Sequence, residues 1–183
     1  QEENSSVDII DFSIGSNILD ATFNNNLIGN ASKSRTLSLY LCNKKQIYNI
    51  NCTNYHKARN TKSEIRSFSI IEGFSKLIFN GLIKIEESAS GSIAYQKEDN
   101  LVLSKDAEVC PLPKLEISNE DVKCSHATSI TSIDDEKIFY LMSRGLSEEQ
   151  AKKTIVTSYF NKFFDLIQDK NLKQEFIGDV KYE

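Results

Sequence analysis

The sequence predicts a mainly β chain that ends in a helical subdomain. Short apolar runs alternate with polar breaks from residue 7 to residue 130. β-Branched and aromatic residues are frequent in these runs. Several runs alternate apolar and polar side chains with a period of two, as in Thr36–Leu41 and Leu82–Ile85, which is typical of half-buried strands. After Ile130 the pattern changes to capping residues and helical apolar spacing, which indicates helices.

The expected strands are short and follow one another without an intervening helix. Regular short spacing of this kind fits a sandwich, a barrel or a solenoid. Asn80-Gly81 is the one pair in this part of the sequence that resembles a tight hairpin turn. We therefore expect parallel, coiled pairing over residues 7–130 rather than a meander of hairpins. The expected strands are Val7–Ile14, Thr36–Cys42, Ser67–Ile71, Lys76–Phe79, Leu82–Ile85, Ser92–Tyr95, Asn100–Leu103 and Lys114–Ile117.

The first helix is expected to end at Ser143. Ser132 or Asp134 caps its start, and Ile138 lies on its apolar side. Gly145 follows at the position where a helix commonly ends in a left-handed residue. The sequence therefore predicts a short helix with a glycine stop.

A second helix is expected from Ser147 to about Asp169. Ser147 and Gln150 form a capping box, and Leu172–Ile177 is expected to form a shorter closing piece. The apolar residues of the second helix fall at three- and four-residue spacing, which indicates one amphipathic stripe. These residues are Ala151, Ile155, Tyr159, Phe163, Leu166 and Ile167.

Length and charge exclude several classes of protein. The 183 residues suit one domain with a small subdomain, here expected as residues 1–130 and 131–183. Lys and Arg number 22 and Asp and Glu 26, for a net charge of −4, whereas a nucleic-acid surface usually shows clustered basic residues. No apolar run approaches a membrane-spanning length. We therefore expect neither nucleic acid nor membrane as a partner, and the polar start at Gln1 suggests a fragment or a processed chain.

Four cysteines occur without a Cys-x-x-Cys pair. At this density a disulfide framework is not expected, and free thiols in a reducing compartment are the better interpretation. Cys124 and His126 stand two residues apart, which places both side chains on the same face of a strand. Thiolate sulfur and imidazole nitrogen together suit iron or an iron–sulfur cluster. Two ligands do not complete a site, and the structural alternative is a small buried cysteine.

Enzyme chemistry has little support in the sequence. Neither His56 nor His126 stands near a nucleophile elbow or a Ser/Asp constellation. The sequence contains no phosphate-binding loop and no G-x-G-x-x-G motif. We therefore expect a protein without catalytic residues of its own.

Four consecutive strings carry a family resemblance. They are Gln96-Lys-Glu-Asp-Asn-Leu-Val-Leu-Ser104, Pro113-Lys-Leu-Glu-Ile117, Glu120-Asp-Val-Lys-Cys-Ser-His-Ala-Thr128 and Ile138-Phe-Tyr-Leu-Met-Ser-Arg-Gly145. Together they resemble the SufB/SufD family of the SUF iron–sulfur cluster assembly system, and within it the C-terminal part of the SufD branch. SufB typically shows Glu-His-Glu-Ala-Thr where this chain has Cys-Ser-His-Ala-Thr, and Ala127 replaces a glycine that is usual in SufD.

The resemblance implies a right-handed parallel β-helix, truncated at its N-terminus, followed by a C-terminal helical subdomain. It implies a non-catalytic scaffold subunit of the SufBCD complex that pairs with SufB through the β-helix and with the SufC ATPase through the helices. His126 and Cys124 would hold iron or a nascent cluster shared with a partner subunit. The residues expected at the ATPase interface are Tyr140, Arg144, Gly145, Ile155 and Phe160.

The resemblance also implies a transient iron–sulfur cluster and an association of the complex with reduced flavin. The expected compartment is the cytoplasm, or a plastid-type organelle if a targeting signal precedes this sequence. Three alternatives stay open. They are a SufB-like subunit, an interaction platform without a metal role, and a homodimer of the isolated chain.

Overall fold

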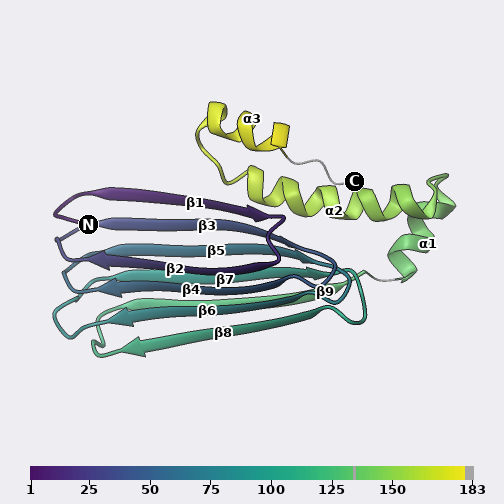
Figure 1. Ribbon diagram of the computed structural model, residues 1–183. Helices are drawn as coiled ribbons and strands as arrows, with labels where there is room; N and C mark the ends of the chain where they lie inside the picture. The colour runs from purple at the N-terminus through teal and green to yellow at the C-terminus, as the bar shows by residue number, and fades with distance from the viewer. Residues whose placement is uncertain (134, 180–183) are drawn as a thin grey trace. The chain divides into compact units, whose positions relative to one another are not determined.

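The computed structural model describes residues 1–133 and 135–179. The chain divides into two compact units, Gln1–Thr131 and Ser132–Glu183. The first unit is a stack of coils, and successive strands along the chain alternate between two sheets, so that a full coil adds one strand to each sheet (Figure 1). Its strands are β1 Ser6–Ile14, β2 Ile18–Leu27, β3 Lys33–Cys42, β4 Ile47–His56, β5 Lys62–Ile71, β6 Lys76–Ile85, β7 Ile93–Val102, β8 Glu108–Ile117 and β9 Lys123–Ser132.

Odd-numbered strands form one sheet and even-numbered strands form the other. The orders are β1-β3-β5-β7-β9 and β2-β4-β6-β8. Pairing is parallel from β1 to β7 and from β2 to β8, and the register repeats, so that Lys33 pairs with Lys62 and Lys62 with Ile93. This arrangement confirms the expected parallel β-helix, with about four coils over residues 1–133.

The strands are longer than the sequence indicated. Lys76–Phe79 and Leu82–Ile85 belong to one strand, β6, and the Asn80-Gly81 pair lies inside it rather than in a turn. In the same way, β7 runs through the polar stretch that seemed to separate two strands. The reason is that Gln96, Glu98 and Asn100 are themselves buried, so this polar stretch is part of the interior and not a loop.

The core of the first unit lies between the two sheets. Its largest fully buried side chains include Tyr40, Tyr48 and Phe79, and the rings of Tyr40 and Phe79 meet with centroids 6.2 Å apart. Side chains two residues apart on a strand point to the same face of the sheet, so every second side chain of each strand points into this interior. The interior cluster consists of Tyr40, Cys42, Tyr48, Ile50, Cys52, Ile65, Ile71, Leu77, Phe79, Ile83, Ile85, Ala89 and Ala94.

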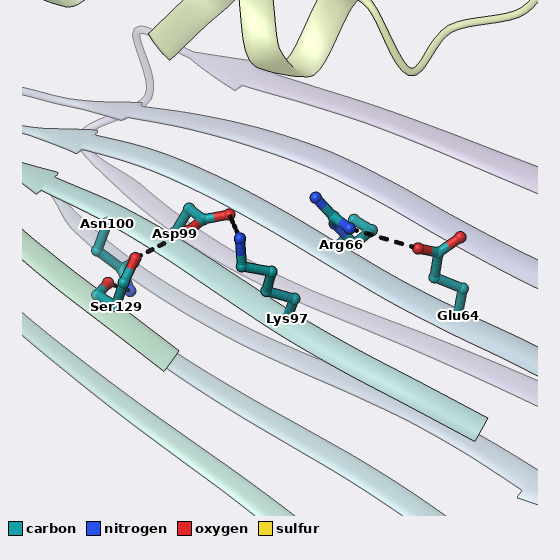
Figure 2. A network of polar contacts seen from close by, with 6 residues as sticks. All are labelled: Glu64, Arg66, Lys97, Asp99, Asn100 and Ser129. Carbon is teal, nitrogen blue, oxygen red and sulfur yellow. Dashed lines mark hydrogen bonds and ion pairs between the residues drawn. The ribbon is translucent and has the colours of Figure 1, made fainter. Parts of the chain in front are cut away.

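Polar contacts attach the last strand to the sheet. Ser129 of β9 donates to Asp99 Oδ1 of β7 at 2.8 Å, and Asn100 donates to the Ser129 carbonyl at 3.1 Å. Asp99 also pairs with Lys97 at 3.0 Å. Figure 2 shows these contacts together with the neighbouring Arg66–Glu64 pair of β5. The backbone continues the same pattern, since the Lys123 N–H donates to the Ser92 carbonyl at 3.0 Å.

The second unit contains α1 Asp135–Ser143, α2 Glu148–Phe164 and α3 Lys170–Asp179. The predicted capping box is confirmed. Ser147 Oγ accepts from the Gln150 N–H at 3.2 Å, and Gln150 Oε1 accepts from the Ser147 N–H at 2.8 Å. Gly145 has φ +97°, as expected for a left-handed helix stop. Asp134, one of the two residues expected to cap α1, lies outside the described residues.

The second helix ends five residues earlier than expected. Asp169 does not close α2 but begins α3, because its carboxylate accepts from the backbone N–H groups of Asn171 and Leu172 at 2.8 and 3.1 Å. An Asp in this position satisfies the unpaired donors of a helix start. None of the helices within the described residues is both long enough and apolar enough to cross a membrane.

Candidate functional site

Cys124 and His126 lie on β9, the last strand of the five-stranded sheet. Cys124 is half-buried and packs against the interior cluster. His126, two residues along the strand, is therefore on the same face, but it is exposed to solvent. The structure thus places the predicted pair on one face of the terminal strand, with the sulfur turned toward the interior and the imidazole accessible.

The electrostatic setting of the two groups differs. Burial raises the pKa of the Cys124 thiol above its ordinary value, so the thiol holds its proton at neutral pH. A metal would have to displace that proton, because thiolate and not thiol is the ligand. Within residues 1–133 and 135–179 the His126 ring makes no hydrogen bond. Its ring nitrogens are therefore available to an incoming group.

An open depression reaches the Cys124 side chain from the β8–β9 turn. Backbone and side-chain bonds hold this turn. The Asp121 N–H donates to Asn119 Oδ1 at 2.8 Å, the Asp121 carbonyl accepts from the Gly91 N–H at 2.7 Å, and Ser90 Oγ donates to Asp121 Oδ2 at 2.6 Å. Two of these three hydrogen bonds thus attach the turn to Ser90 and Gly91 of the preceding coil. The lining residues are Ile117, Ser118, Asn119, Glu120, Val122 and Cys124.

Cys124 and His126 do not form a complete metal site by themselves. Among the described residues, no group of three or more His, Cys, Asp and Glu side chains is arranged to hold a metal ion. A tetrahedral iron or cluster site needs about four ligands. If the pair binds iron, further ligands must come from outside this part of the chain.

The other thiols and the second histidine have structural positions. None of the four cysteines forms a disulfide, as the sequence predicted. Burial raises the pKa values of Cys42 and Cys52 to about 12, which makes these thiols poor ligands. His56 is fully buried, and its two ring nitrogens lie 2.7 Å from the hydroxyl oxygens of Thr61 and Ser63. Burial lowers its pKa to about 4, so His56 is a neutral core residue.

The five residues expected at an ATPase interface have different environments. Tyr140 is 57% exposed. The Arg144 guanidinium lies 5.5 Å from the Tyr140 ring centroid and donates to its hydroxyl at 3.3 Å. Gly145 follows the C-terminal end of α1, and Ile155 on α2 is half-buried. Phe160 is only 5% exposed, so its ring cannot be reached directly by a partner in this conformation.

Sequence reasoning missed one polar pair of the interior. Gln96 and Glu98 are both buried in β7, although they appeared in the sequence only as part of a polar string. The signal was their spacing of two residues, which puts both on one strand face. Nothing in the sequence showed that this face is the interior one.

Together, the coils, the register and the accessible terminal strand define a parallel β-solenoid protein with a helical C-terminal unit. The family model described as "SUF system FeS cluster assembly, SufBD core domain" matches residues 1–159. A protein from Staphylococcus epidermidis named "Iron-sulfur cluster assembly SufBD family protein" is 32% identical over 161 residues, which cover 88% of this chain and 35% of that protein. Relatives from Staphylococcus haemolyticus and Staphylococcus aureus show the same identity and coverage.

The chain therefore belongs to the SufB/SufD family of iron–sulfur cluster assembly proteins. It spans about a third of the length of the curated relatives that it matches.

Proposed function

We propose that this chain is a SufD-type scaffold subunit without catalytic residues of its own, acting in iron–sulfur cluster assembly. Family membership supports the process, and the Cys124-Ser125-His126 string supports SufD over SufB. The observation that carries the proposal is the half-site on β9, where an accessible imidazole and a half-buried thiol share one strand face. The cluster is cargo that the assembly builds and passes on.

An incomplete ligand set is what a shared site at a subunit interface requires. β9 is the outermost strand of its sheet within the described residues, and an outermost strand leaves backbone groups available for a partner. We propose that SufB covers this end of the solenoid and supplies the missing ligands. In this proposal reduced flavin associates with the assembled complex, which works in the reducing environment of the cytoplasm or of a plastid-type organelle.

His126→Ala is expected to lower iron and sulfide loading of the complex reconstituted with SufB and SufC, while this chain keeps its stability. Removing an exposed side chain that makes no hydrogen bond in the described chain changes the free energy of unfolding by about 0.5 kcal/mol or less. The metal site, in contrast, loses the His126 imidazole, which is one of its few ligands, so iron loading should fall. Iron and acid-labile sulfide are measured per complex, with denaturant unfolding of the isolated variant alongside.

Ser125→Ala is the matched control, because Ser125 is an exposed neighbour on the opposite face of β9. Its complex should load iron like the wild type. Unchanged loading in His126→Ala would favour the second candidate, an interaction platform with no metal role. A SufB-like role, or a homodimer in place of the SufB pair, would appear in co-purification as assembly without added SufB.

We further propose that SufC docks on the helical unit around Tyr140 and Arg144. An aromatic ring stacked by a guanidinium is a common anchor at protein interfaces, and this pair is largely accessible. Phe160 would support the surface from beneath, where it stacks on Phe164 with centroids 6.4 Å apart. Gly145 and Ile155 would border the anchor.

Tyr140→Ala is expected to weaken SufC binding about tenfold or more, because truncating an interface anchor costs roughly 1.4–2 kcal/mol. Binding is measured by titration of SufC against the full chain. Thr157→Ala, at an exposed position of α2, is the control and should bind normally. Wild-type affinity in Tyr140→Ala would show that the docking surface lies elsewhere.

A further inference from the structure

The solenoid interior contains a carboxyl–carboxamide pair that the proposed function does not use. Glu98 is 1% exposed and Gln96 is 0% exposed. Gln96 Nε2 donates to Glu98 Oε1 at 2.7 Å. Glu98 continues an in-register polar row across the five-stranded sheet, in which Asp11, Ser38 and Ser67 precede it. A carboxyl group buried between two sheets must be paired with a cation or be protonated, because an unpaired buried charge is costly.

The opposite sheet is shaped to hold this pair. Gly81 of β6 faces Gln96 across the interior, and a Cβ atom at this position would lie 2.0 Å from Gln96 Nε2. The absence of a side chain at Gly81 therefore leaves the space that the Gln96 amide occupies. A glycine in a strand often marks such a close approach. Gln96 is thus enclosed between the two sheets and cannot turn to solvent.

The pair lacks one donor. Glu98 Oε2 and Gln96 Oε1 are both buried, and neither has a hydrogen-bond partner within the described residues. Both are acceptors when Glu98 is ionised, so they cannot satisfy each other. A single proton on Glu98 Oε2 converts one of them into a donor. The same proton removes the buried charge.

The surroundings favour the neutral acid. By strand alternation, the interior positions around Glu98 carry Ser67 on β5, Phe79 and Gly81 on β6, and Pro111 and Pro113 on β8. The titratable groups that face this interior are Asp11 of β1, Tyr40 and Cys42 of β3, Tyr48, Cys52 and His56 of β4, and Cys124 and His126 of β9.

None of these groups is a Lys or Arg. Burial lowers the pKa of His56 to about 4, so it is neutral near pH 7, and His126 is exposed at the end of the stack. Burial raises the pKa of Glu98 to about 7, with the Gln96 hydrogen bond acting in the opposite direction. Burial also raises the pKa of Asp11.

We propose that Glu98 and Gln96 form an internal proton-binding site of the solenoid. Neutral Glu98 donates from Oε2 to Gln96 Oε1 while Gln96 Nε2 donates to Glu98 Oε1, which closes the pair with two hydrogen bonds. Loss of the proton to bulk water breaks one of these bonds and leaves a carboxylate between the sheets. The coils around β7 are therefore tighter in the protonated form, and the fold senses pH near neutrality.

The direction of the effect follows from linkage. The folded chain keeps the Glu98 proton up to about pH 7, whereas the unfolded chain releases it near the ordinary glutamate pKa of 4.5. Between these values the folded chain binds more protons, so its stability falls as pH rises. The contribution of Glu98 to the unfolding equilibrium constant should grow by roughly a hundredfold or more from about pH 4.5 to about pH 8.

The test is a carboxyl titration of the full chain labelled with ¹³C at the glutamate side chains. One glutamate signal is expected to titrate near neutral pH, to disappear in Glu98→Gln and to persist in Glu64→Gln, the variant of a partly exposed glutamate in the same sheet. The ratio of the unfolding constants of wild type and Glu98→Gln, taken at each pH, should also rise between about pH 5 and pH 8, because His56 contributes equally to both. Titration of every glutamate below about pH 5.5 would overturn the proposal. So would a neutral-range signal that survives in Glu98→Gln.

Discussion

Replacing His56 by alanine is expected to lower the free energy of unfolding at pH 7 by about 3–5 kcal/mol, the range of a disrupted buried polar network. The side chain is fully buried. Its removal leaves a cavity and takes the hydrogen-bond partner from Ser63, whereas Thr61 keeps the Ala58 carbonyl and Ser92. Denaturant unfolding followed by circular dichroism measures the loss.

The cost of His56→Ala should shrink in acid. Folded His56 takes up a proton only near pH 4, whereas the unfolded residue does so near 6.5. Stability from neutral His56 is therefore present above about pH 6.5 and is lost as pH falls toward 4, by roughly 3 kcal/mol. Subtracting the variant from the wild type at each pH isolates this effect. It should be measured this way because Glu98 has the opposite pH dependence and flattens the wild-type profile.

His126→Ala is the natural control, because these are the two histidines of the chain. It should leave the free energy of unfolding at pH 7 nearly unchanged. Equal losses in the two variants would contradict the assignment of His56 to the core and His126 to the surface. A cost of His56→Ala that stays constant from about pH 7 to pH 4 would contradict the lowered pKa.

Replacing Gly81 by valine is expected to cost about 1–3 kcal/mol, the usual range for overpacking. Valine favours strands, so the loss must come from the collision of its Cβ with the enclosed Gln96 amide, 2.0 Å away. Asn80→Val tests the adjacent, outward position of the same strand, where added bulk meets solvent. That variant should stay within about 0.5 kcal/mol of the wild type.

A double-mutant cycle identifies the cause. In a Gln96→Ala background the space beside Gly81 is vacated, so Gly81→Val should lose most of its cost. A coupling energy of about 1 kcal/mol or more is expected for residues in contact. Additive effects of the two substitutions would mean that the glycine is needed for another reason than room for Gln96.

Local rules predicted much of the fold. Period-two alternation located the β-rich part, and the Ser147–Gln150 capping box and Gly145 marked helix boundaries that the structure confirms. These signals succeed because they depend on residues close in sequence. Asn80-Gly81 misled for the opposite reason. Its role is decided by Gln96, on a strand of the other sheet.

The candidate site shows the same division. The spacing of Cys124 and His126 was enough to place both on one strand face. It could not show that one side chain packs against the interior while the other is exposed, because that depends on β9 being the outermost strand of its sheet. Phe160 was expected at the ATPase interface, but its side chain is buried and its ring stacks on Phe164 of the same helix.

The repeating register has a thermodynamic consequence for the terminal strand. In a solenoid each coil touches only its immediate neighbours, so stability is nearly a sum of nearest-neighbour terms. An internal coil is held from two sides, whereas β9 is held by β7 alone within its sheet. The segment that carries Cys124 and His126 should therefore fray before the internal coils, with the fastest amide hydrogen exchange among the strands of its sheet from β3 onward. Docking of a partner on β9 would add the missing neighbour term, so that the half-site becomes rigid when its remaining ligands arrive.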